Sequence, residues 1–329
     1  MSGNSVHPFE QLKPDFLMAA IESQGHWCDG RLLALNSYEN RVYQVGIEDQ
    51  QPLIAKFYRP NRWSEAQILE EHAFCFELFE QELPVVPPLR NEQGQSLFQH
   101  DGFHFSLFER KGGHAPELDN LDNLLIIGRL MGRIHSIGAS RAFSHRPELN
   151  SQSFGHSCVQ YISEQFIPAS LKPAYDSLCR DLLQAIDERL QQTQEIPLIR
   201  THGDCHSGNM LWRDDNPHFV DFDDARMAPA IQDLWMFLSG DRARKTAQIS
   251  ELVEGYNEFY DFHPRELQLV EVLRSLRMIH YAYWLASRWQ DPAFPMNFPW
   301  FNTERYWGEH ILELREQLAA LEEPTLTLF

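Results

Sequence analysis

The chain of 329 residues is 43% hydrophobic and 23% charged, which excludes a disordered or fibrous protein and leaves room for two lobes. Its formal net charge of −19 argues against binding to nucleic acid or to an anionic membrane surface, because both require clustered lysine and arginine. The five cysteines are scattered without a Cys-x-x-Cys pair and no apolar stretch reaches membrane-spanning length, so we expect a soluble, cytoplasmic protein with reduced thiols.

The first predicted elements are three β-strands, at residues 31–35, 41–47 and 52–58, which form an antiparallel meander. Alternation along the third strand puts Lys56 in the middle of an otherwise apolar face. Such a lysine either extends to water from an edge strand or needs a negatively charged partner in the fold.

A helix follows, and Ser64 with Gln67 forms a capping box at its start. On the helical wheel Glu71 lies at the border of the apolar face, whereas Glu70 lies on the polar side. The sequence therefore predicts an ion pair between Glu71 and Lys56, and a substitution of Glu70 should be nearly silent.

Two more strands, at residues 96–98 and 103–108, are joined by an Asp-Gly turn that is typical of a hairpin. The polar segment 109–113, with two glycines, follows them, and we predict a hinge there. Residues 1–108 would then form an N-terminal lobe with five strands and one helix.

From residue 121 onward the periodicity is helical, and Gly128 and Gly132 share a helix face on which they permit close packing. Further helices are predicted at residues 173–191, 231–238, 248–260, 264–288 and 303–321. Residues 114–329 would therefore form a mainly helical C-terminal lobe.

The most informative stretch lies in this second lobe and contains Asp204, Asn209 and Asp221. Residues 210–212 and 218–222 have the pattern of a hairpin, and a loop at 214–216 would place Asn209 opposite Asp221. Asp204 precedes Asn209 in a loop tightened by glycines, so its carboxylate can face the same opening. Ligands that are all oxygen suit Mg²⁺.

Two other interpretations stay open for this stretch. Aspartate and asparagine are common in turns, so each of these residues taken singly could have only that role. His202, Asp204 and His206 could also be ligands of zinc or iron in a metal hydrolase, although no further histidine or cysteine cluster supplies a remaining ligand.

The two lobes together match the requirements of phosphoryl transfer from ATP. Lys56, oriented by Glu71, would offset charge on the α- and β-phosphates. Magnesium held by Asn209 and Asp221 would bridge phosphate oxygens, and Asp204 would orient the attacking hydroxyl and accept its proton. The N-terminal lobe would thus bind the nucleotide.

These residues carry a family resemblance. His202-Gly203-Asp204 with Asn209, followed by Val220-Asp221-Phe222-Asp223, resembles the signature of the aminoglycoside phosphotransferase and choline kinase group, relatives of the protein kinases. More narrowly, the chain is similar to the stress response kinase A family of bacteria over nearly its whole length, most clearly in segments 35–43, 56–60, 68–72 and 232–236. The resemblance implies an α+β, two-lobed protein-kinase-like fold and a cytoplasmic, ATP- and magnesium-dependent Ser/Thr protein kinase.

The resemblance also implies roles for single residues. Asp204 would be the catalytic base, and Asp221, with Asn209, would bind the catalytic magnesium. Ser37 would lie in the nucleotide loop, and Asp233 would brace the catalytic loop unless it only caps a helix. The expected partners are ATP and a protein with a Ser or Thr acceptor, and we expect a monomer that binds neither nucleic acid nor membrane.

Some features depart from an ordinary protein kinase. No Gly-x-Gly-x-x-Gly motif is present, and residues 36–40 occupy the phosphate-covering position. No long activation segment follows Asp221, which argues against regulation through its phosphorylation.

Other functions stay open as alternatives. The main alternative is a small-molecule hydroxyl kinase of the aminoglycoside, choline or homoserine kinase type. A catalytically silent nucleotide-binding module is less well supported by the sequence, because every expected catalytic residue is present. A cationic acceptor or a basic peptide would suit the acidic residues Asp214, Asp215, Asp223 and Asp224.

Overall fold

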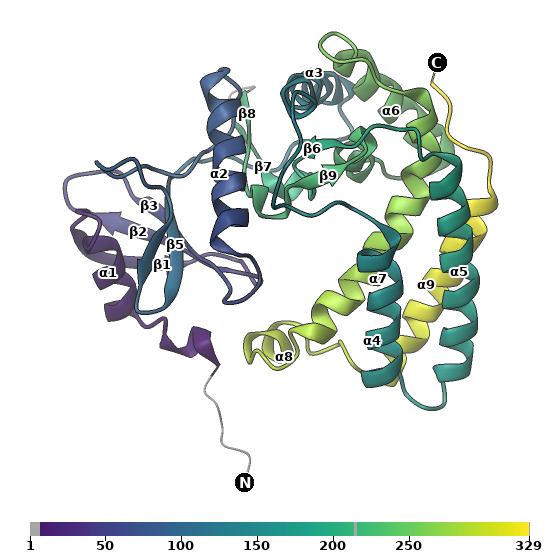
Figure 1. Ribbon diagram of the computed structural model, residues 1–329, viewed down its shortest axis with the longest axis horizontal. Helices are drawn as coiled ribbons and strands as arrows, with labels where there is room; N and C mark the ends of the chain where they lie inside the picture. The colour runs from purple at the N-terminus through teal and green to yellow at the C-terminus, as the bar shows by residue number, and fades with distance from the viewer. Residues whose placement is uncertain (1–6, 214–215, 329) are drawn as a thin grey trace. The chain divides into compact units, whose positions relative to one another are not determined.

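The computed structural model describes residues 7–213 and 216–328, and the chain forms two compact units (Figure 1). Unit 1 consists of Met1–Pro116, Ser144–Arg146 and Gly208–Asp223. Unit 2 consists of Glu117–Phe143, Pro147–Ser207 and Asp224–Phe329. Each unit therefore contains segments that lie far apart in the sequence. The predicted lobe limits, with a hinge at 109–113, stay a prediction.

Unit 1 is built on a five-stranded antiparallel sheet in the order β1-β2-β3-β5-β4. The strands are β1 (Cys28–Ala34), β2 (Arg41–Ile47), β3 (Leu53–Phe57), β4 (Phe98–His100) and β5 (Phe103–Glu109). The predicted meander and hairpin are confirmed. In the hairpin, Asp101 and Gly102 have φ values of 41° and 86°, as a two-residue turn requires.

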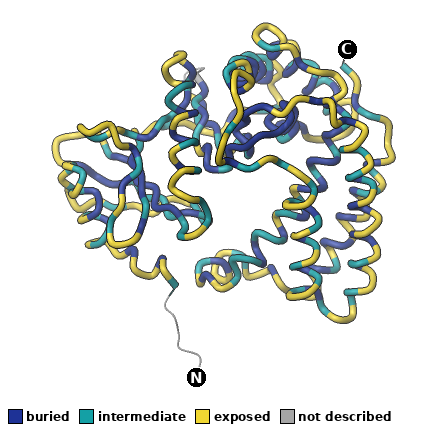
Figure 2. The backbone as a smooth tube through the Cα atoms, viewed as in Figure 1, coloured by how far each residue is buried: buried dark blue, intermediate teal, exposed yellow. Residues whose placement is uncertain are grey.

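The core of unit 1 joins this sheet to the helix α1 (Pro14–Glu22), which the sequence patterns did not predict. Leu17 of α1 belongs to the same buried cluster as Phe57 and Phe105, whose ring centroids lie 5.1 Å apart in a stacked arrangement. Figure 2 shows buried stretches of backbone (dark blue) along the strands of this sheet. Before α1 lies a short 3-10 helix, Pro8–Gln11. The aromatic side chains of β3 and β5 thus fix the central strands.

The predicted helix is α2 (Glu65–Glu80), and its capping box is present. Its buried residues include His72, whose Nε2 lies 2.9 Å from Tyr58 Oη, just after β3. A hairpin of β7 (Met210–Arg213) and β8 (Asn216–Phe219) completes unit 1. Its predicted turn residues, Asp214 and Asp215, lie outside the described residues.

Unit 2 is mainly helical, as predicted, so the α+β fold class is confirmed. Its helices are α3 (Leu121–Gly138), α4 (Ser157–Gln165), α5 (Lys172–Gln192), α6 (Arg242–Tyr256), α7 (Val270–Ser287), α8 (Ala293–Asn297) and α9 (Glu304–Glu322). α3 packs on α6, α4 on α7, and α5 on α9. A small sheet of β6 (Ile199–Thr201) and β9 (Arg226–Ala228) lies among them. Within the described ranges, no helix has the length and hydropathy of a membrane span.

The helix predicted at residues 231–238 is wrong. Two 3-10 turns, Ala230–Asp233 and Trp235–Phe237, occupy this segment. The N–H of Ile231 donates to Glu266 Oε2 at 2.7 Å. A side chain from another segment thus satisfies a backbone donor at the start of the turn, so local periodicity did not decide its form.

The close packing predicted for Gly128 and Gly132 is confirmed. A Cβ at Gly128 would lie 2.1 Å from the carbonyl oxygen of Leu252, and one at Gly132 would lie 2.4 Å from that of Tyr256. Gly255 of α6 approaches the Leu125 carbonyl in the same way, at 2.2 Å. The backbones of α3 and α6 therefore touch where neither helix can carry a side chain.

Gly132→Ala should destabilise unit 2 by about 1–3 kcal/mol, because the added methyl must push α6 away. The measurement is the midpoint of thermal unfolding by calorimetry. Gly308→Ala is the matched control, since a Cβ there has no atom within 4 Å and alanine favours the helix α9. A Gly132→Ala midpoint at or above that of the wild type would contradict the packing.

Candidate functional site

Lys56 is the buried charge at the centre of unit 1. It lies on β3 between Val42 of β2 and Ser106 of β5, so its strand is central. Its side chain is 7% exposed, and Nζ lies 2.8 Å from Asp221 Oδ1 and 3.1 Å from Asp223 Oδ1. Burial alone would lower the pKa of Lys56, but the carboxylates raise it above its usual value. The alternative of a lysine that extends to water is therefore wrong.

Asp221 follows β8 in a backbone conformation that few residues other than glycine adopt. Its φ is 62°, in the left-handed region, and its side chain is 52% exposed. The next residue, Phe222, is buried and packs edge-on against Phe74 of α2, with ring centroids 6.0 Å apart. Backbone strain of this kind is concentrated at functional sites. One carboxylate oxygen of Asp221 holds Lys56, while the side chain stays accessible to a ligand.

The hairpin before this turn differs from the prediction by one residue in register. Met210 lies opposite Phe219, and the N–H of Val220 donates to the Asn209 carbonyl at 3.0 Å. Asn209 is therefore opposite Val220 rather than Asp221, because the loop is one residue shorter than predicted. Asn209 and Asp221 still border the same end of the hairpin.

The ion pair predicted between Lys56 and Glu71 is wrong. Glu71 instead pairs with Arg146, whose Nη2 lies 3.3 Å from Glu71 Oε2. The same nitrogen donates to the carbonyls of Phe222 at 3.3 Å and Asp223 at 2.9 Å. The Arg146 and Glu71 side chains are 0% and 3% exposed. Arg146 thereby joins α2 to the backbone of the turn after β8.

The error has a physical reason. Helical periodicity identifies the buried side of α2 but not the charged residue that the rest of the chain brings to it. Arg146 lies 75 positions further along the chain, and Lys56 is already paired with Asp221 and Asp223. Burial raises the pKa of Glu71 to about 7, although the charges of Lys56 and Arg146 oppose that rise.

Glu70 has a role that the sequence did not indicate. Its carboxylate accepts the backbone N–H groups of Ser144, His145 and Arg146, the last two at 2.8 Å. Burial alone would raise the pKa of Glu70, but these bonds lower it below its usual value. A substitution of Glu70 is therefore not expected to be silent, because Glu70 holds the segment that carries Arg146.

Ser37 lies in the loop between β1 and β2. Its Oγ donates to the carbonyl of Asn40 at 3.3 Å, and the side chain of Asn40 accepts the N–H of Arg59 at 3.0 Å. Arg59 also donates to the carbonyls of Glu39 at 2.9 Å and Tyr38 at 3.0 Å. Side chains thus hold the base of this loop, and the nucleotide contact of Ser37 stays a prediction.

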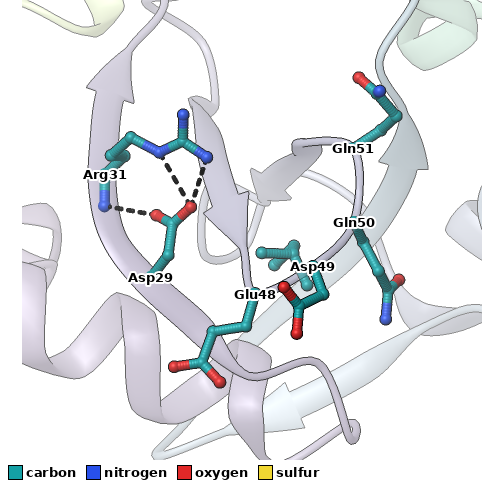
Figure 3. Close-up of a pocket in the computed structure, with 7 residues that line it drawn as sticks. Asp29, Arg31, Glu48, Asp49, Gln50 and Gln51 are labelled. Atoms are coloured by element: carbon teal, nitrogen blue, oxygen red, sulfur yellow. Dashed lines mark hydrogen bonds and ion pairs between the residues drawn. The ribbon is translucent and has the colours of Figure 1, made fainter.

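Unit 1 also has a hollow of about 680 Å³ that none of the predicted site residues lines. Figure 3 shows Asp29 turned toward Arg31, which donates to it from its backbone N at 2.9 Å and from Nε at 2.8 Å. Glu48 and Asp49 line the same hollow. It is therefore distinct from the candidate site.

In unit 2, Asp233 braces the loop after β6. Its carboxylate accepts the N–H groups of His202 at 2.6 Å and Gly203 at 2.9 Å, and it lies 3.1 Å from Nε2 of the buried His135. The bracing role predicted for Asp233 is thus confirmed. Gly203 has a φ of 85°, and a Cβ there would lie 2.0 Å from the Asp224 carbonyl, so only glycine fits this loop.

Asp204 follows the braced loop and contacts two basic side chains. Its Oδ1 accepts a hydrogen bond from Arg277 Nη1, and its Oδ2 lies 3.5 Å from His206 Nε2. Burial alone would raise the pKa of Asp204, but the hydrogen bond from His206 and the charge of Arg277 lower it below its usual value. The carboxylate is therefore ionised at neutral pH.

The described residues include no group of three or more His, Cys, Asp or Glu side chains that could hold a metal ion. His202 is fully buried, and its Nδ1 accepts the N–H of Asp204 at 3.4 Å. The alternative metal site at His202, Asp204 and His206 therefore gains no support. Asn209 and Asp221 offer oxygen donors, and magnesium needs few protein ligands because it keeps water and phosphate oxygens.

The sequence patterns did not indicate Arg146 and Arg277, which contact predicted site residues. Arg277 lies one helical turn after Arg274 on α7, and this spacing could have indicated a basic face. Arg146 lies outside the helices and strands, in a segment without hydrophobic periodicity. The sequence held no signal for its role.

Comparisons with known sequences place the chain among phosphotransferases. The model of the family described as "Phosphotransferase enzyme family" matches residues 31–270. Stress response kinase A of Escherichia coli K12 is 43% identical over 326 residues, which cover 99% of this chain and 98% of the relative. Serine/threonine protein kinase RdoA of Salmonella typhimurium is 44% identical over the same shares of each chain.

Solved structures of small-molecule kinases have a similar fold. A complex of amicoumacin kinase hAmiN with AMP-PNP and Ca²⁺ superposes with a TM-score of 0.72 at 18% identity, covering 96% of each chain. A microcompartment-associated aminopropanol kinase gives 0.68 at 17% identity, covering 93% of this chain and 96% of the other. Spectinomycin phosphotransferase gives 0.63 at 17% identity, covering 95% and 96%. These similarities confirm the two-lobed, kinase-like fold.

Arg146→Met should lower the stability of unit 1 by about 3–5 kcal/mol, because it removes the ion-pair partner of the buried Glu71 carboxylate. In a double-mutant cycle with Glu71→Gln, the two losses should fall short of additivity by at least about 0.5 kcal/mol. The measurement is urea unfolding followed by fluorescence. Additive losses for this pair, with strong coupling between Glu71 and Lys56 instead, would favour the ion pair predicted from the sequence.

Glu70→Ala tests the support of Arg146 in the same assay. It should also destabilise unit 1, since it leaves backbone N–H groups of residues 144–146 without their acceptor. Glu80→Ala is the control, because Glu80 is exposed on the same helix.

Proposed function

We propose that this chain, which belongs to the phosphotransferase enzyme family and within it to the family of stress response kinase A, phosphorylates proteins on Ser or Thr in a bacterial stress response. Its family membership makes it an ATP-dependent kinase. We further propose that magnesium is its metal and that Asp204 is its base.

The observation that carries the proposal is the buried ammonium of Lys56 beside the half-exposed carboxylate of Asp221. A permanent cation in this setting would attract phosphate oxygens of ATP. Asp221 would then release Lys56 in favour of a metal ion, with Asn209 as a second oxygen ligand. Magnesium, when bound, would neutralise phosphate charge, and carboxylate and carboxamide oxygens suit it. Ser37 would contact the nucleotide from its loop.

Glu71 and Arg146 would act on this site indirectly. Arg146 Nη2 holds the carbonyls of Phe222 and Asp223, so it fixes the turn that begins at Asp221. Glu71 would neutralise Arg146 rather than orient Lys56. Both would therefore be positioning residues for the metal ligand.

Asp204 would accept the proton of the acceptor hydroxyl at a carboxylate oxygen. The contacts of Arg277 and His206 lower its pKa, which makes it a weak base that is always ionised near neutral pH. Phosphoryl transfer passes through a loose transition state in which the nucleophile needs orientation more than early deprotonation. A weak, fixed carboxylate suits that task.

We propose a protein as the acceptor of the phosphoryl group. A relative named serine/threonine protein kinase RdoA favours a protein acceptor. The fold is shared with amicoumacin, aminopropanol and spectinomycin kinases, so a small-molecule alcohol is the alternative. The deciding experiment is transfer of labelled phosphate from ATP into a cell lysate, with protein separated from small-molecule products.

Asp204→Asn should lower the rate of transfer by about 10²- to 10⁴-fold, because it removes the proton acceptor. Affinity for AMP-PNP with magnesium should be unchanged in isothermal titration calorimetry. Asp181→Asn is the matched control, since Asp181 is exposed on α5. Near-normal turnover of Asp204→Asn in a clean preparation would show that Asp204 is not the base.

Asp221→Ala should weaken magnesium-dependent nucleotide binding as well as the rate, because it removes a metal ligand. Titration of magnesium at a fixed concentration of AMP-PNP measures the effect. Identical titration curves for mutant and wild type would show that Asp221 is not a ligand.

A further inference from the structure

Unit 2 has a cavity of about 400 Å³ whose lining includes His206, Trp235, Arg274, Arg277, Met278 and Tyr281. None of the described residues that line it is acidic. Arg277 and His206 are also the residues that contact the carboxylate of Asp204. The cavity therefore begins beside the proposed base.

Two donors in the wall of this cavity have no acceptor in the part of the chain that the structure describes. Trp235 is 5% exposed, and neither its Nε1 nor Nη2 of Arg274 has a hydrogen-bond partner among the described residues. Arg274 is held by Glu271, which accepts from its Nε at 3.1 Å, and by the Trp235 ring, whose centroid is 5.1 Å from the guanidinium carbon. A buried donor without a partner destabilises the fold. A ligand with acceptor atoms would remove that destabilisation after a rotation of these side chains.

The cavity residues define the charge of such a ligand. Arg274 and Arg277 are permanently cationic, and Trp235 can only donate. The carboxylates nearest to the two arginines, Glu271 and Asp204, already pair with them. The N–H of Trp235 and Nη2 of Arg274 still have no acceptor among the described residues, so an anion would find donors here, whereas the described lining offers no acidic side chain to a cationic amine.

We propose that this cavity is the acceptor subsite and that it binds a carboxylate or phosphate group of the molecule whose hydroxyl is phosphorylated. The inference rests on the proposed function, because it takes Asp204 as the base. In the transfer the acceptor oxygen forms a bond to the γ-phosphorus, the bond from that phosphorus to the ADP oxygen breaks, and the hydroxyl proton passes to Asp204. Arg277 turns from Asp204 to the bound anion, which leaves the carboxylate able to take the proton.

This substrate class differs from the cationic acceptor that the acidic residues of the sequence suggested. Asp223 is paired with Lys56 and Arg62 within unit 1. Asp224 is paired with Arg226 within unit 2. These carboxylates are already neutralised by the fold, so they give no net attraction for an amine.

The test compares matched acceptors with the full chain, labelled ATP and magnesium. One arm uses Ser peptides that differ only in flanking aspartate, glutamine or lysine, and the other uses glycerate and glycerol 3-phosphate against glycerol and choline. Acidic peptides or anionic alcohols should have the higher kcat/KM within their arm. The arm with the higher values identifies the source of the anion.

Arg274→Gln and Trp235→Phe remove one unpaired donor each without touching Asp204. Each should lower kcat/KM for the preferred anionic acceptor by about 10- to 100-fold, chiefly through KM, and leave the neutral acceptor nearly unchanged. Arg277→Gln should also lower kcat/KM for the anionic acceptor, and it should move the acidic limb of the pH profile to higher pH with every acceptor, since it removes a charge that lowers the pKa of Asp204.

Arg265→Gln is the matched control, because Arg265 is exposed in unit 2 and pairs with Glu195 outside the cavity. Preference for lysine-flanked peptides or choline, or equal losses with neutral and anionic acceptors, would overturn the subsite. If the lysate is labelled in an Asp204-dependent way but no anionic probe is preferred, the subsite alone fails. If no labelling depends on Asp204, the proposed function fails with it.

Discussion

Unit 1 depends on the burial of one lysine charge inside a β-sheet. Lys56 lies on a central strand with its side chain 7% exposed, and removing such a charge from water costs several kcal/mol unless partners compensate for it. The sheet itself offers no carboxylate at that point, since Lys56 lies between Val42 and Ser106. The compensation comes from the turn after β8, so a segment more than a hundred and fifty positions away must dock beside the strand.

That requirement explains the second buried charge pair. The turn presents Asp221 and Asp223 to Lys56, but its backbone carbonyls at Phe222 and Asp223 need a donor. Arg146 supplies it and brings a buried positive charge of its own, which Glu71 neutralises. Glu70 completes the arrangement by accepting the N–H groups around Arg146. The adjacent glutamates of α2 thus have different roles. Glu71 is the counter-ion of Arg146, and Glu70 accepts backbone N–H groups.

Much of this could be predicted from the sequence, because strands, capping boxes and helical stripes are local patterns. Alternation identified Lys56 as a charge on an apolar face, and periodicity placed Glu71 on the buried border of α2. Partner choice could not be predicted, since Arg146 reaches Glu71 only through the tertiary fold. The predicted register of the β7–β8 hairpin was wrong by one residue. The pairing depends on the length of the loop, and the residue composition of that turn does not fix this length. The segment 231–238 forms 3-10 turns, in which Leu234, Phe237 and Leu238 donate to carbonyls three positions earlier. The N–H of Ile231 donates instead to the side chain of Glu266, a distant partner that local periodicity does not reveal.

Asp204 is a carboxylate that contacts two basic side chains, whereas Lys56 is a cation that contacts two carboxylates. This difference affects how an acceptor would be recognised. The proposed base lies beside Arg277 and His206, which lower its pKa, and Arg277 occupies one of its carboxylate oxygens. Its basicity increases when a neighbouring cation turns to another anion, because the Coulomb term that lowers its pKa then weakens. An acceptor that carries a negative group beside its hydroxyl would supply that anion as it binds. Recognition and activation of the acceptor would then be one event, and an acceptor without the negative group would meet a base still neutralised by Arg277.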